Sequence, residues 1–234
     1  MGIVVPAGAV ALGGPLADPA PAPLRAALWQ RLAQLVSFPT AALRREIADG
    51  TLAAEVHDLA GALPYRLDVS RVALRGEAAA AAAEAEAEYI RLFDVPVDGP
   101  TVPLYGGVHS GRDRRQVMEE LLRHYRHFGL PTAAAPARDV PDAVATVLEF
   151  LHILASIEPH GAGVDAARAA QRDVLARHIT RWTPGILDGL RRPLPLYRAS
   201  LDLVHRFALA ELARLGGEGA RPEPVSVRLA VRAV

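Results

Sequence analysis

One segment of the chain, residues 140–157, is apolar on almost every side of the helix that it is expected to form. Its apolar residues recur at spacings that cover most of a helix's circumference. They are Val144, Val147, Leu148, Phe150, Leu151, Ile153, Leu154 and Ile157. A helix with this pattern is stable only when other elements surround it. The sequence therefore predicts a bundle in which this helix lies deep.

The rest of the chain has the composition and the spacing to supply the surrounding helices. Apolar residues make up about half of the chain and are mainly Ala, Leu and Val, and Ala and Leu favour helix. Residues 77–88 contain only Ala and Glu, which favours a slim helix over a linker. We predict an all-α, single-domain helical bundle over residues 24–215. Its helices are expected at about 24–36, 40–49, 51–63, 70–93, 113–128, 140–157, 164–182 and 196–215, with a short helical turn at 184–190.

Both ends of the chain differ from this helical pattern. Residues 1–23 are interrupted by Pro and Gly and contain no Lys or Arg, so neither a signal peptide nor a membrane span is expected. Residues 216–234 end in an alternating apolar pattern without a partner strand. We expect disordered tails at 1–23 and 216–234. The chain has no cysteine, which fits a reducing compartment, and a cytoplasmic location is expected.

Residues 94–111 form a long loop that is rich in Pro and Gly but not polar. Val95, Val97, Val102, Leu104 and Tyr105 lie within it. Long loops in compact domains are often functional, and an apolar one indicates a packed or binding segment. A tight turn and a close approach of a ligand to the backbone explain Gly106 and Gly107 equally well.

Charge and motifs narrow the function. Acidic and basic residues balance at 26 each, so the basic surplus of a nucleic-acid-binding protein is absent. All the basic residues are arginine, and the sequence contains no glycine-rich phosphate loop, nucleophile elbow or zinc-protease motif. His124 and His127 follow Glu120 at a spacing that could seat a metal, but an exposed polar face is the favoured interpretation. Trp29 and Trp182 are expected in the core or at its rim.

Asp142 and Glu149 lie on the one polar stripe of the 140–157 segment. Seven helical residues separate them, which places them on one face about 10 Å apart. Two interpretations stay open. In one, Asp142 offsets the helix dipole and the stripe is the solvent line of the helix. In the other, the stripe is the acidic wall of a groove for a basic, apolar peptide.

Four segments, in this order along the chain, resemble a known family. They are 88–94 (Glu-Tyr-Ile-Arg-Leu-Phe-Asp), 103–107 (Pro-Leu-Tyr-Gly-Gly), 140–142 (Val-Pro-Asp) with 148–151 (Leu-Glu-Phe-Leu), and a weaker pattern from Arg168 through Gln171 to Trp182 and Pro184. Met118-Glu119-Glu120 and Tyr125-x-x-Phe128-Gly129-Leu130 follow the second segment. Together they are similar to the TorD/DmsD/NarJ assembly chaperones of molybdenum enzymes. The second segment and Met118-Glu119-Glu120 most resemble the chaperones of type II DMSO-reductase-family enzymes, which include dimethyl sulfide, ethylbenzene, chlorate and selenate oxidoreductases.

This resemblance implies a TorD-like helical fold and a function in protein binding. The partner would be the apo catalytic subunit of a molybdenum oxidoreductase, often bound through its twin-arginine leader and held until the cofactor is inserted. The resemblance implies no stably bound cofactor, and leaves open a transient contact with molybdopterin guanine dinucleotide. The peptide-binding residues that it implies are Tyr89, Leu92, Phe93, Pro103, Tyr105, Pro141, Asp142 and Glu149. Ala143 and Val147 depart from the family pattern, in which a histidine and an acidic residue are common.

We therefore predict a cytoplasmic chaperone that is not an enzyme and that has no catalytic residues, metal site, nucleic-acid partner or membrane span. The alternatives are a helical enzyme and a small-ligand-binding regulator with a site in the 94–111 loop. A regulator would need a basic helix-turn-helix, which is not found. A monomer and a swapped dimer are both compatible with the sequence.

Overall fold

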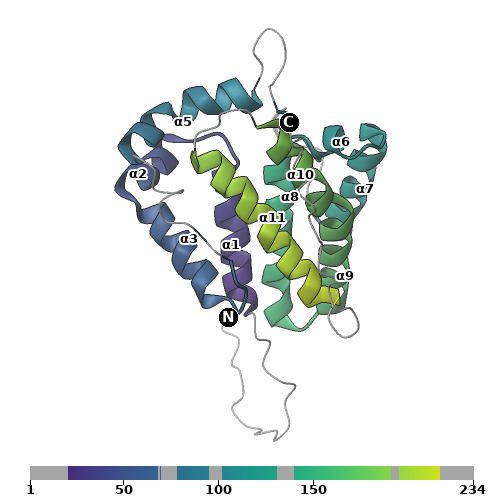
Figure 1. Ribbon diagram of the computed structural model, residues 1–234. Coiled ribbons are helices and arrows are strands. Elements are labelled where there is room, and N and C mark those ends of the chain that lie inside the picture. The colour runs from purple at the N-terminus through teal and green to yellow at the C-terminus, as the bar shows by residue number, and fades with distance from the viewer. Residues whose placement is uncertain are drawn as a thin grey trace, which may run out of the picture.

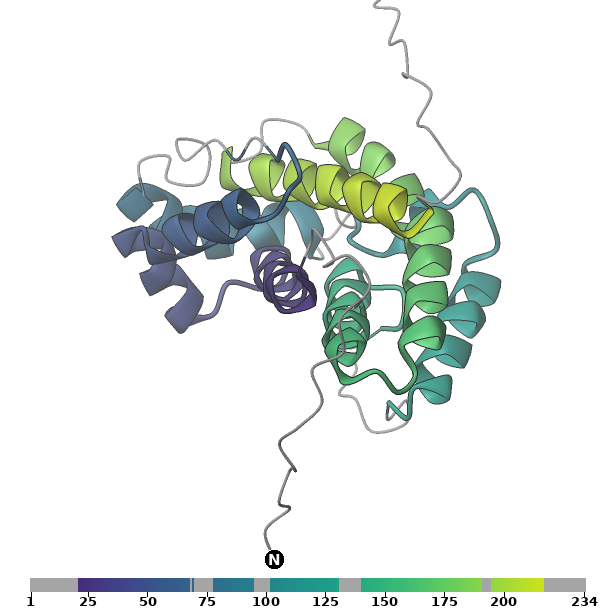
Figure 2. The same cartoon turned by 90° about the horizontal axis from the view of Figure 1, so that it is seen from below.

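The apolar helix lies at the centre of the structure, paired along its length with the first helix. In the computed structural model, α8 (Val144–Ile157) packs lengthwise against α1 (Ala22–Leu35). Figure 2 shows the two helices nearly end-on and side by side in the middle of the molecule. The structure describes residues 21–67, 69, 78–94, 102–130, 140–190 and 195–216, and most of these residues are helical. The all-α prediction is confirmed.

The other helices are arranged around this pair. On one flank lie α2 (Ala41–Asp49), α3 (Thr51–Ala62) and α5 (Ala78–Phe93), and α2 packs against both of the others. On the other flank lie α7 (Arg114–His127), α9 (Val164–Val174) and α10 (Thr180–Gly189). The long α11 (Pro195–Gly216) lies across the bundle and contacts α1, α9 and α10. The short α6 (Gly106–His109) contacts α7 and α10.

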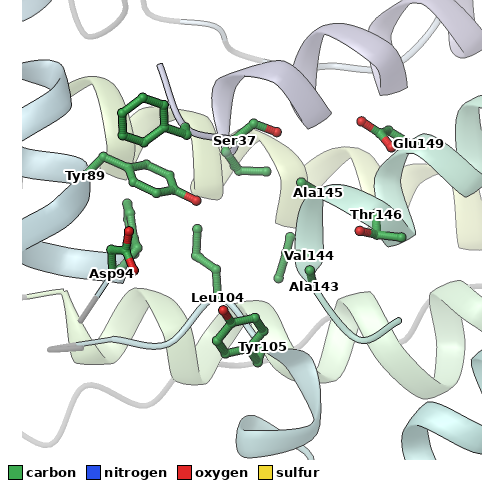
Figure 3. Close-up of a pocket in the computed structure, with 13 residues that line it drawn as sticks. Ser37, Tyr89, Asp94, Leu104, Tyr105, Ala143, Val144, Ala145, Thr146 and Glu149 are labelled. Carbon is green, nitrogen blue, oxygen red and sulfur yellow. The ribbon is translucent and has the colours of Figure 1, made fainter. Parts of the chain in front are cut away.

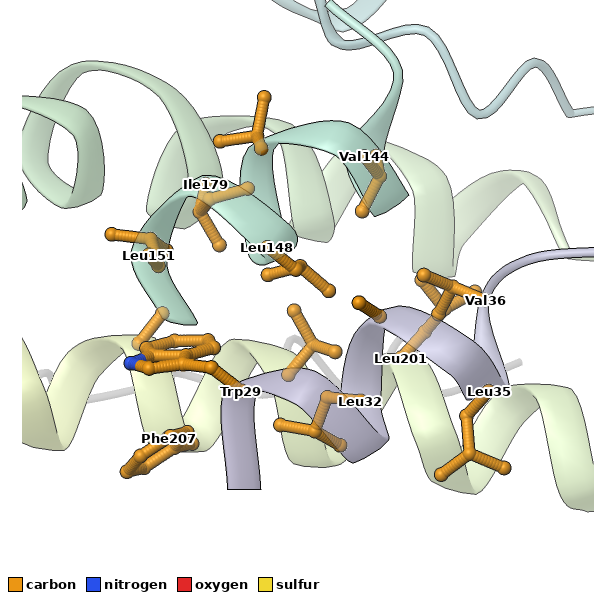
Figure 4. Close-up of a cluster of buried hydrophobic side chains, with 14 of the residues drawn as sticks. Trp29, Leu32, Leu35, Val36, Val144, Leu148, Leu151, Ile179, Leu201 and Phe207 are labelled. Carbon is orange, nitrogen blue, oxygen red and sulfur yellow. The ribbon is translucent and has the colours of Figure 1, made fainter. Parts of the chain in front are cut away.

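Leucines of α1, spaced three and four residues apart, form part of the core between α1, α8 and α11. Leu28, Leu32 and Leu35 are buried, and Figure 4 shows Leu32 and Leu35 on the side of α1 towards α11. The Trp29 ring lies 4.2 Å from the Phe207 ring of α11, measured between centroids. Trp29 and Trp182 are both fully buried, so their predicted place in the core is confirmed. Burial of large side chains of this kind supplies most of the stability of such a bundle.

Local signals in the sequence place several helix ends. The Thr40 hydroxyl accepts a hydrogen bond from the Leu43 amide at the start of α2, and the Asp113 carboxylate accepts one from the Arg115 amide at the start of α7. These caps satisfy amide groups that have no partner within the helix. Gly50 has a φ of 80°, which lets the chain turn directly from α2 into α3.

The structure corrects four predicted boundaries. α8 begins at Val144 and not at 140, because residues 141–143 form a turn that pairs with the loop before α6. The helices expected at 164–182 and 184–190 are one continuous run, with a π-helix at Leu175–Ile179 and Pro184 inside α10. The 94–111 loop contains α6 in its described part. α1 begins at Ala22, inside the tail predicted at 1–23. Residues 1–20 of that tail, residues 217–234 of the tail predicted at 216–234 and residues 70–77 of the helix predicted at 70–93 lie outside the described residues.

A buried ionic network lies beyond the C-terminal end of α8. The Arg25 guanidinium donates two hydrogen bonds to the Glu158 carboxylate, at 2.8 and 2.9 Å, and one to Glu211 at 3.2 Å. None of these three side chains is more than 2% exposed. Arg168 and Gln171 of α9 and Arg214 of α11 also donate to Glu158. The network therefore ties α1, α9 and α11 to the short 3-10 helix, Glu158–His160, that follows α8.

Glu158→Gln tests the contribution of this network to stability. The change removes one of two carboxylates from a buried arginine, and an uncompensated buried charge is costly. We expect the free energy of unfolding to fall by about 3–5 kcal/mol at neutral pH, measured by urea denaturation. Glu119→Gln, in the exposed Arg115–Glu119 pair, is the matched control and should change the value by less than about 1 kcal/mol.

The same group gives the stability a pH dependence. Burial raises the pKa of the Glu158 carboxyl. The hydrogen bonds that Arg25 and Gln171 donate to it lower this pKa by more than burial raises it, and the resulting pKa is about 2. The stabilisation from this carboxylate is complete above its unfolded pKa near 4.5 and is lost as the pH falls towards 2. The difference in unfolding free energy between the wild type and Glu158→Gln should therefore shrink over that range. A difference that is constant between pH 5 and pH 2.5 would contradict this assignment.

Candidate binding groove

A groove with a volume of about 260 Å³ opens where four segments of the chain meet. The segments are the end of α1 with the residues after it, the end of α5, residues 104–105, and the first turns of α8 (Figure 3). These segments are far apart in the sequence, and the bundle brings them to one end of the α1–α8 pair. The lining residues are Val36, Ser37, Phe38, Tyr89, Phe93, Asp94, Leu104, Tyr105, Ala143, Val144, Ala145, Thr146 and Glu149.

Aromatic side chains build one wall of the groove. The Tyr89 ring lies 5.6 Å from the Phe38 ring and 5.2 Å from the Phe93 ring, both in edge-to-face arrangements. Behind them, the Phe93 ring contacts the Tyr197 ring of α11 at 5.3 Å. The Tyr197 hydroxyl donates to the carbonyl of Ala85 in α5, and burial raises the pKa of this hydroxyl. Because the cluster is held from behind, the Tyr89 and Phe38 rings form a firm apolar surface.

The opposite wall depends on a short pairing between two loops. The Gly106 amide donates to the Asp142 carbonyl at 2.7 Å, and the Val144 amide donates to the Leu104 carbonyl at 2.9 Å. Tyr105 and Ala143 form an isolated antiparallel bridge between them. The Tyr125 hydroxyl donates to the Pro141 carbonyl at 2.8 Å and fixes the second loop from the side of α7. The Tyr105 side chain is thereby directed to the groove (Figure 3).

Gly106 and Gly107 are required by packing. A Cβ atom at Gly106 would lie 2.0 Å from Cε3 of the buried Trp182 ring. A Cβ atom at Gly107 would lie 2.5 Å from Cγ of Arg114 and 2.9 Å from a carboxylate oxygen of Asp142. All three distances are shorter than a van der Waals contact, so the turn can approach its neighbours only because these two residues have no side chain. Neither of the two explanations suggested by the sequence, a tight turn or access for a ligand, includes this contact.

Asp142 does not lie where the sequence predicts. Its side chain is fully buried, it precedes α8, and its carboxylate accepts hydrogen bonds from Arg114 at 2.8 and 3.0 Å and from the Gly107 amide at 3.1 Å. Neither of the two interpretations that the sequence left open therefore describes Asp142, which shares no face of α8 with Glu149 and lies on no solvent line. A buried carboxylate with these partners holds the loop together and has no open side for a peptide. The hydrogen bonds that Arg114 donates to the Asp142 carboxylate also raise the pKa of Arg114.

Glu149 remains at the groove, and Asp94 accompanies it. Both side chains are exposed and both line the groove, where Figure 3 shows them coming from α8 and from the end of α5. Among the lining residues that the structure describes, both charged side chains are acidic. The groove thus combines an aromatic wall with negative charge at its edges.

The eight predicted peptide-binding residues are divided by the structure. Tyr89, Phe93, Tyr105 and Glu149 are brought together in the groove lining. Leu92 and Asp142 are fully buried, whereas Pro103 and Pro141 are partly buried and lie outside the lining. Sequence analysis missed Phe38, Asp94, Thr146 and the supporting residue Arg114. Phe38 stands between Ser37 and Pro39, after the end of the helix expected at 24–36, and no periodic pattern marks it for a function.

The possible metal site on α7 is not formed. Glu120 pairs with Arg112 and Arg177, and His124 Nε2 lies 3.0 Å from Asp173. The His127 ring packs edge-to-face on Phe128. Within the described part of the chain, no group of three or more His, Asp or Glu side chains is arranged to hold a metal ion.

Comparison with known proteins places this chain in a family. The family model described as the nitrate reductase delta subunit matches residues 48–188, which is more than half of the sequence. The chain belongs to this family. The matched range contains α3, α5–α9 and nearly all of α10, and with them every wall of the groove except the segment after α1.

Curated relatives of this chain are named as assembly chaperones. It is 31% identical over 208 residues to the dimethyl sulfide dehydrogenase assembly chaperone of Rhodovulum sulfidophilum, covering 82% of this chain and 81% of the relative. It is 29% identical over 203 residues to the perchlorate reductase assembly chaperone of Dechloromonas aromatica, covering 82% and 89%. The selenate reductase assembly chaperone of Thauera selenatis is 38% identical over 139 residues, covering 56% and 70%. The predicted resemblance to molybdenum-enzyme assembly chaperones is confirmed.

Gly106→Ala tests the packing of the turn in this family member. The added methyl group cannot be accommodated, because the Trp182 ring that it meets is itself buried on all sides. We expect the free energy of unfolding to fall by about 3 kcal/mol, as for other overpacked sites, with a shift of the Trp182 fluorescence. Gly61→Ala is the control: nothing lies within 4 Å of its Cβ, and the change should leave the chain as stable or slightly more stable. Equal effects of the two changes would argue against a close contact at Gly106.

Proposed function

We propose that this chain is an assembly chaperone that binds the apo catalytic subunit of a molybdenum oxidoreductase through the groove between α1, α5 and α8. The bound subunit is held until its cofactor is inserted. The observation that carries the proposal is the chemistry of the groove, in a chain whose relatives are named assembly chaperones. Its aromatic wall is formed by Phe38, Tyr89 and Phe93, and its edges carry the carboxylates of Asp94 and Glu149.

A twin-arginine leader is the segment of the client that fits this chemistry best. Such a leader joins two arginines to an apolar run, so its receptor needs carboxylates beside apolar pockets. In the groove, Asp94 and Glu149 would face the arginines, and the aromatic wall would take the apolar run. The buried Asp142 takes no part in this contact. In this proposal Asp94, and not Asp142, accompanies Glu149 in the acidic part of the interface.

The proposed action is binding without catalysis. Binding takes place in the cytoplasm, while the leader is still attached to the client. The cofactor is delivered to the client and is not held stably by the chaperone, although a transient contact with molybdopterin guanine dinucleotide is compatible with the proposal. No helix in the described part of the chain has the length and the apolar character to cross a membrane.

The alternative functions, an enzyme and a ligand-sensing regulator, were both assigned to the 94–111 loop. The described part of this loop is engaged by the rest of the molecule. His109 Nε2 lies 2.7 Å from the Pro103 carbonyl oxygen, and its ring lies against Gly185 of α10. The residues around Tyr105 are paired with the start of α8. Neither alternative is favoured by a specific observation.

Client binding is the first experiment. The full chain is co-expressed with the catalytic subunit of a molybdenum oxidoreductase from the same genome, once with and once without its leader, and the complexes are isolated by affinity pull-down. We expect retention of the client, and weaker retention without the leader. Equal retention of both forms would place the contact in the mature part of the client, and loss of both would contradict the chaperone proposal.

Tyr89→Ala is expected to reduce retention, because an aromatic anchor at the centre of an interface carries much of the binding energy.

The acidic edges of the groove are tested separately. A peptide with two adjacent arginines should bind Asp94→Asn/Glu149→Gln about tenfold more weakly than the wild type, since each exposed pair contributes up to about 1 kcal/mol. The remaining affinity should also depend less on salt. Fluorescence anisotropy at low and high salt measures both quantities. Glu119→Gln, an exposed carboxylate outside the groove lining, controls for the loss of a single negative charge elsewhere on the surface. Unchanged affinity in the double variant would remove these carboxylates from the interface.

A further inference from the structure

Arg114 lies behind the Tyr105 wall of the groove and contacts the parts that hold this wall. It is the first residue of α7 and is not part of the groove lining. Its Nε donates to one Asp142 oxygen at 2.8 Å, and a terminal nitrogen donates to the other at 3.0 Å. The carbon at the centre of its guanidinium lies 4.7 Å from the centroid of the Tyr105 ring.

The two hydrogen bonds fix the plane of the guanidinium. A bidentate arginine–carboxylate pair has a defined geometry, which a single contact or a lysine would not give. The carboxylate that orients Arg114 is fully buried and also accepts the Gly107 amide. One buried group therefore sets both the position of the cation over the Tyr105 ring and the path of the backbone two residues further on.

The residue after Tyr105 is also fixed by packing. Gly106 packs against the Trp182 ring, with no room even for a methyl group. The Trp182 ring in turn contacts the ring of the buried His178 at 5.0 Å between centroids. Tyr105 thus has the Arg114 cation over its ring and is followed in the chain by a glycine that packing holds in place. The attraction between the cation and the aromatic face is electrostatic and favours this placement of the ring.

We propose that Arg114 is a positioning residue of the groove, which acts on the bound peptide through Tyr105 and does not contact the peptide itself. The inference rests on the proposed function and adds to it a residue that the sequence did not single out. The proposed role differs from two other roles of such a residue in what it predicts. A direct contact would act independently of Tyr105, and a purely structural role would change stability without changing affinity in a Tyr105-dependent way.

The first test needs no ligand. Hydrogen–deuterium exchange of the full chain, followed by mass spectrometry, reports on the amides of Gly106 and Gly107. In Arg114→Gln we expect these amides to exchange about tenfold faster, because the orientation of Asp142 is no longer fixed, while exchange in α1 stays unchanged. Arg115→Gln is the matched control, since it removes the neighbouring charge on the same helix from an exposed pair with Glu119. Wild-type exchange of the turn in Arg114→Gln would overturn the inference.

The second test is a double-mutant cycle on peptide binding. The probe is a fluorescent synthetic peptide with two adjacent arginines followed by an apolar run of Leu, Phe and Ala. We expect Arg114→Gln to weaken binding about tenfold in the wild-type background and not at all in the Tyr105→Ala background. Equal losses in both backgrounds would mean that Arg114 acts independently of Tyr105, and the inference would be wrong.

A further variant protects the test against misfolding. Arg114→Gln/Asp142→Asn removes the cation without leaving a buried carboxylate unpaired, and it should show the same loss of affinity as Arg114→Gln. Full affinity in this folded double variant would also overturn the inference. The failure of the proposed function has a different signature. In that case the wild type does not bind the peptide, whereas the exchange of the turn still responds to Arg114→Gln.

Discussion

Burial of α8 is the constraint from which the arrangement of the other helices follows. Its apolar residues occupy most of its circumference, so α1, α9 and the aromatic residues of α7 have to cover it. A helix with so little polar surface has no stable position at the edge of a domain. The remaining helices are then placed by their contacts with this covered core. The groove lies where the covering ends, at the first turns of α8.

Each end of α8 is flanked by a buried carboxylate that arginines bind. Asp142 precedes the helix and is paired with Arg114, and Glu158 follows it and is paired with Arg25. The two sites have similar chemistry but different consequences. At Glu158 the arginines come from several helices, so the pairing joins the bundle. At Asp142 the pairing joins two loops, and it gives the groove one of its walls. A substitution that weakens one site is therefore expected to leave the geometry of the other intact.

Local patterns in the sequence were sufficient for the helices but not for the site. The helices that follow the caps at Thr40 and Asp113, and the apolar run of α8, depend on neighbouring residues, and the sequence predicts them at 40–49, 113–128 and 140–157. Asp142 was placed on a helix face because seven residues separate it from Glu149, but its partners lie 28 and 35 residues earlier in the chain. Such pairing leaves no periodic signal. The resemblance to a family supplied Tyr89, Phe93 and Tyr105, which the fold brings together in the groove lining, whereas Phe38 and Asp94 required the fold. That these residues bind a peptide stays a prediction.

The groove is assembled from four segments that meet only in the folded chain. A peptide that binds there binds the native state and not the unfolded one, so it shifts the folding equilibrium of its receptor. At a peptide concentration one hundred times the dissociation constant, this effect amounts to about 2.7 kcal/mol. Protection is then mutual: the client is shielded by the chain that holds it, and that chain in turn resists unfolding and proteolysis for as long as it is occupied.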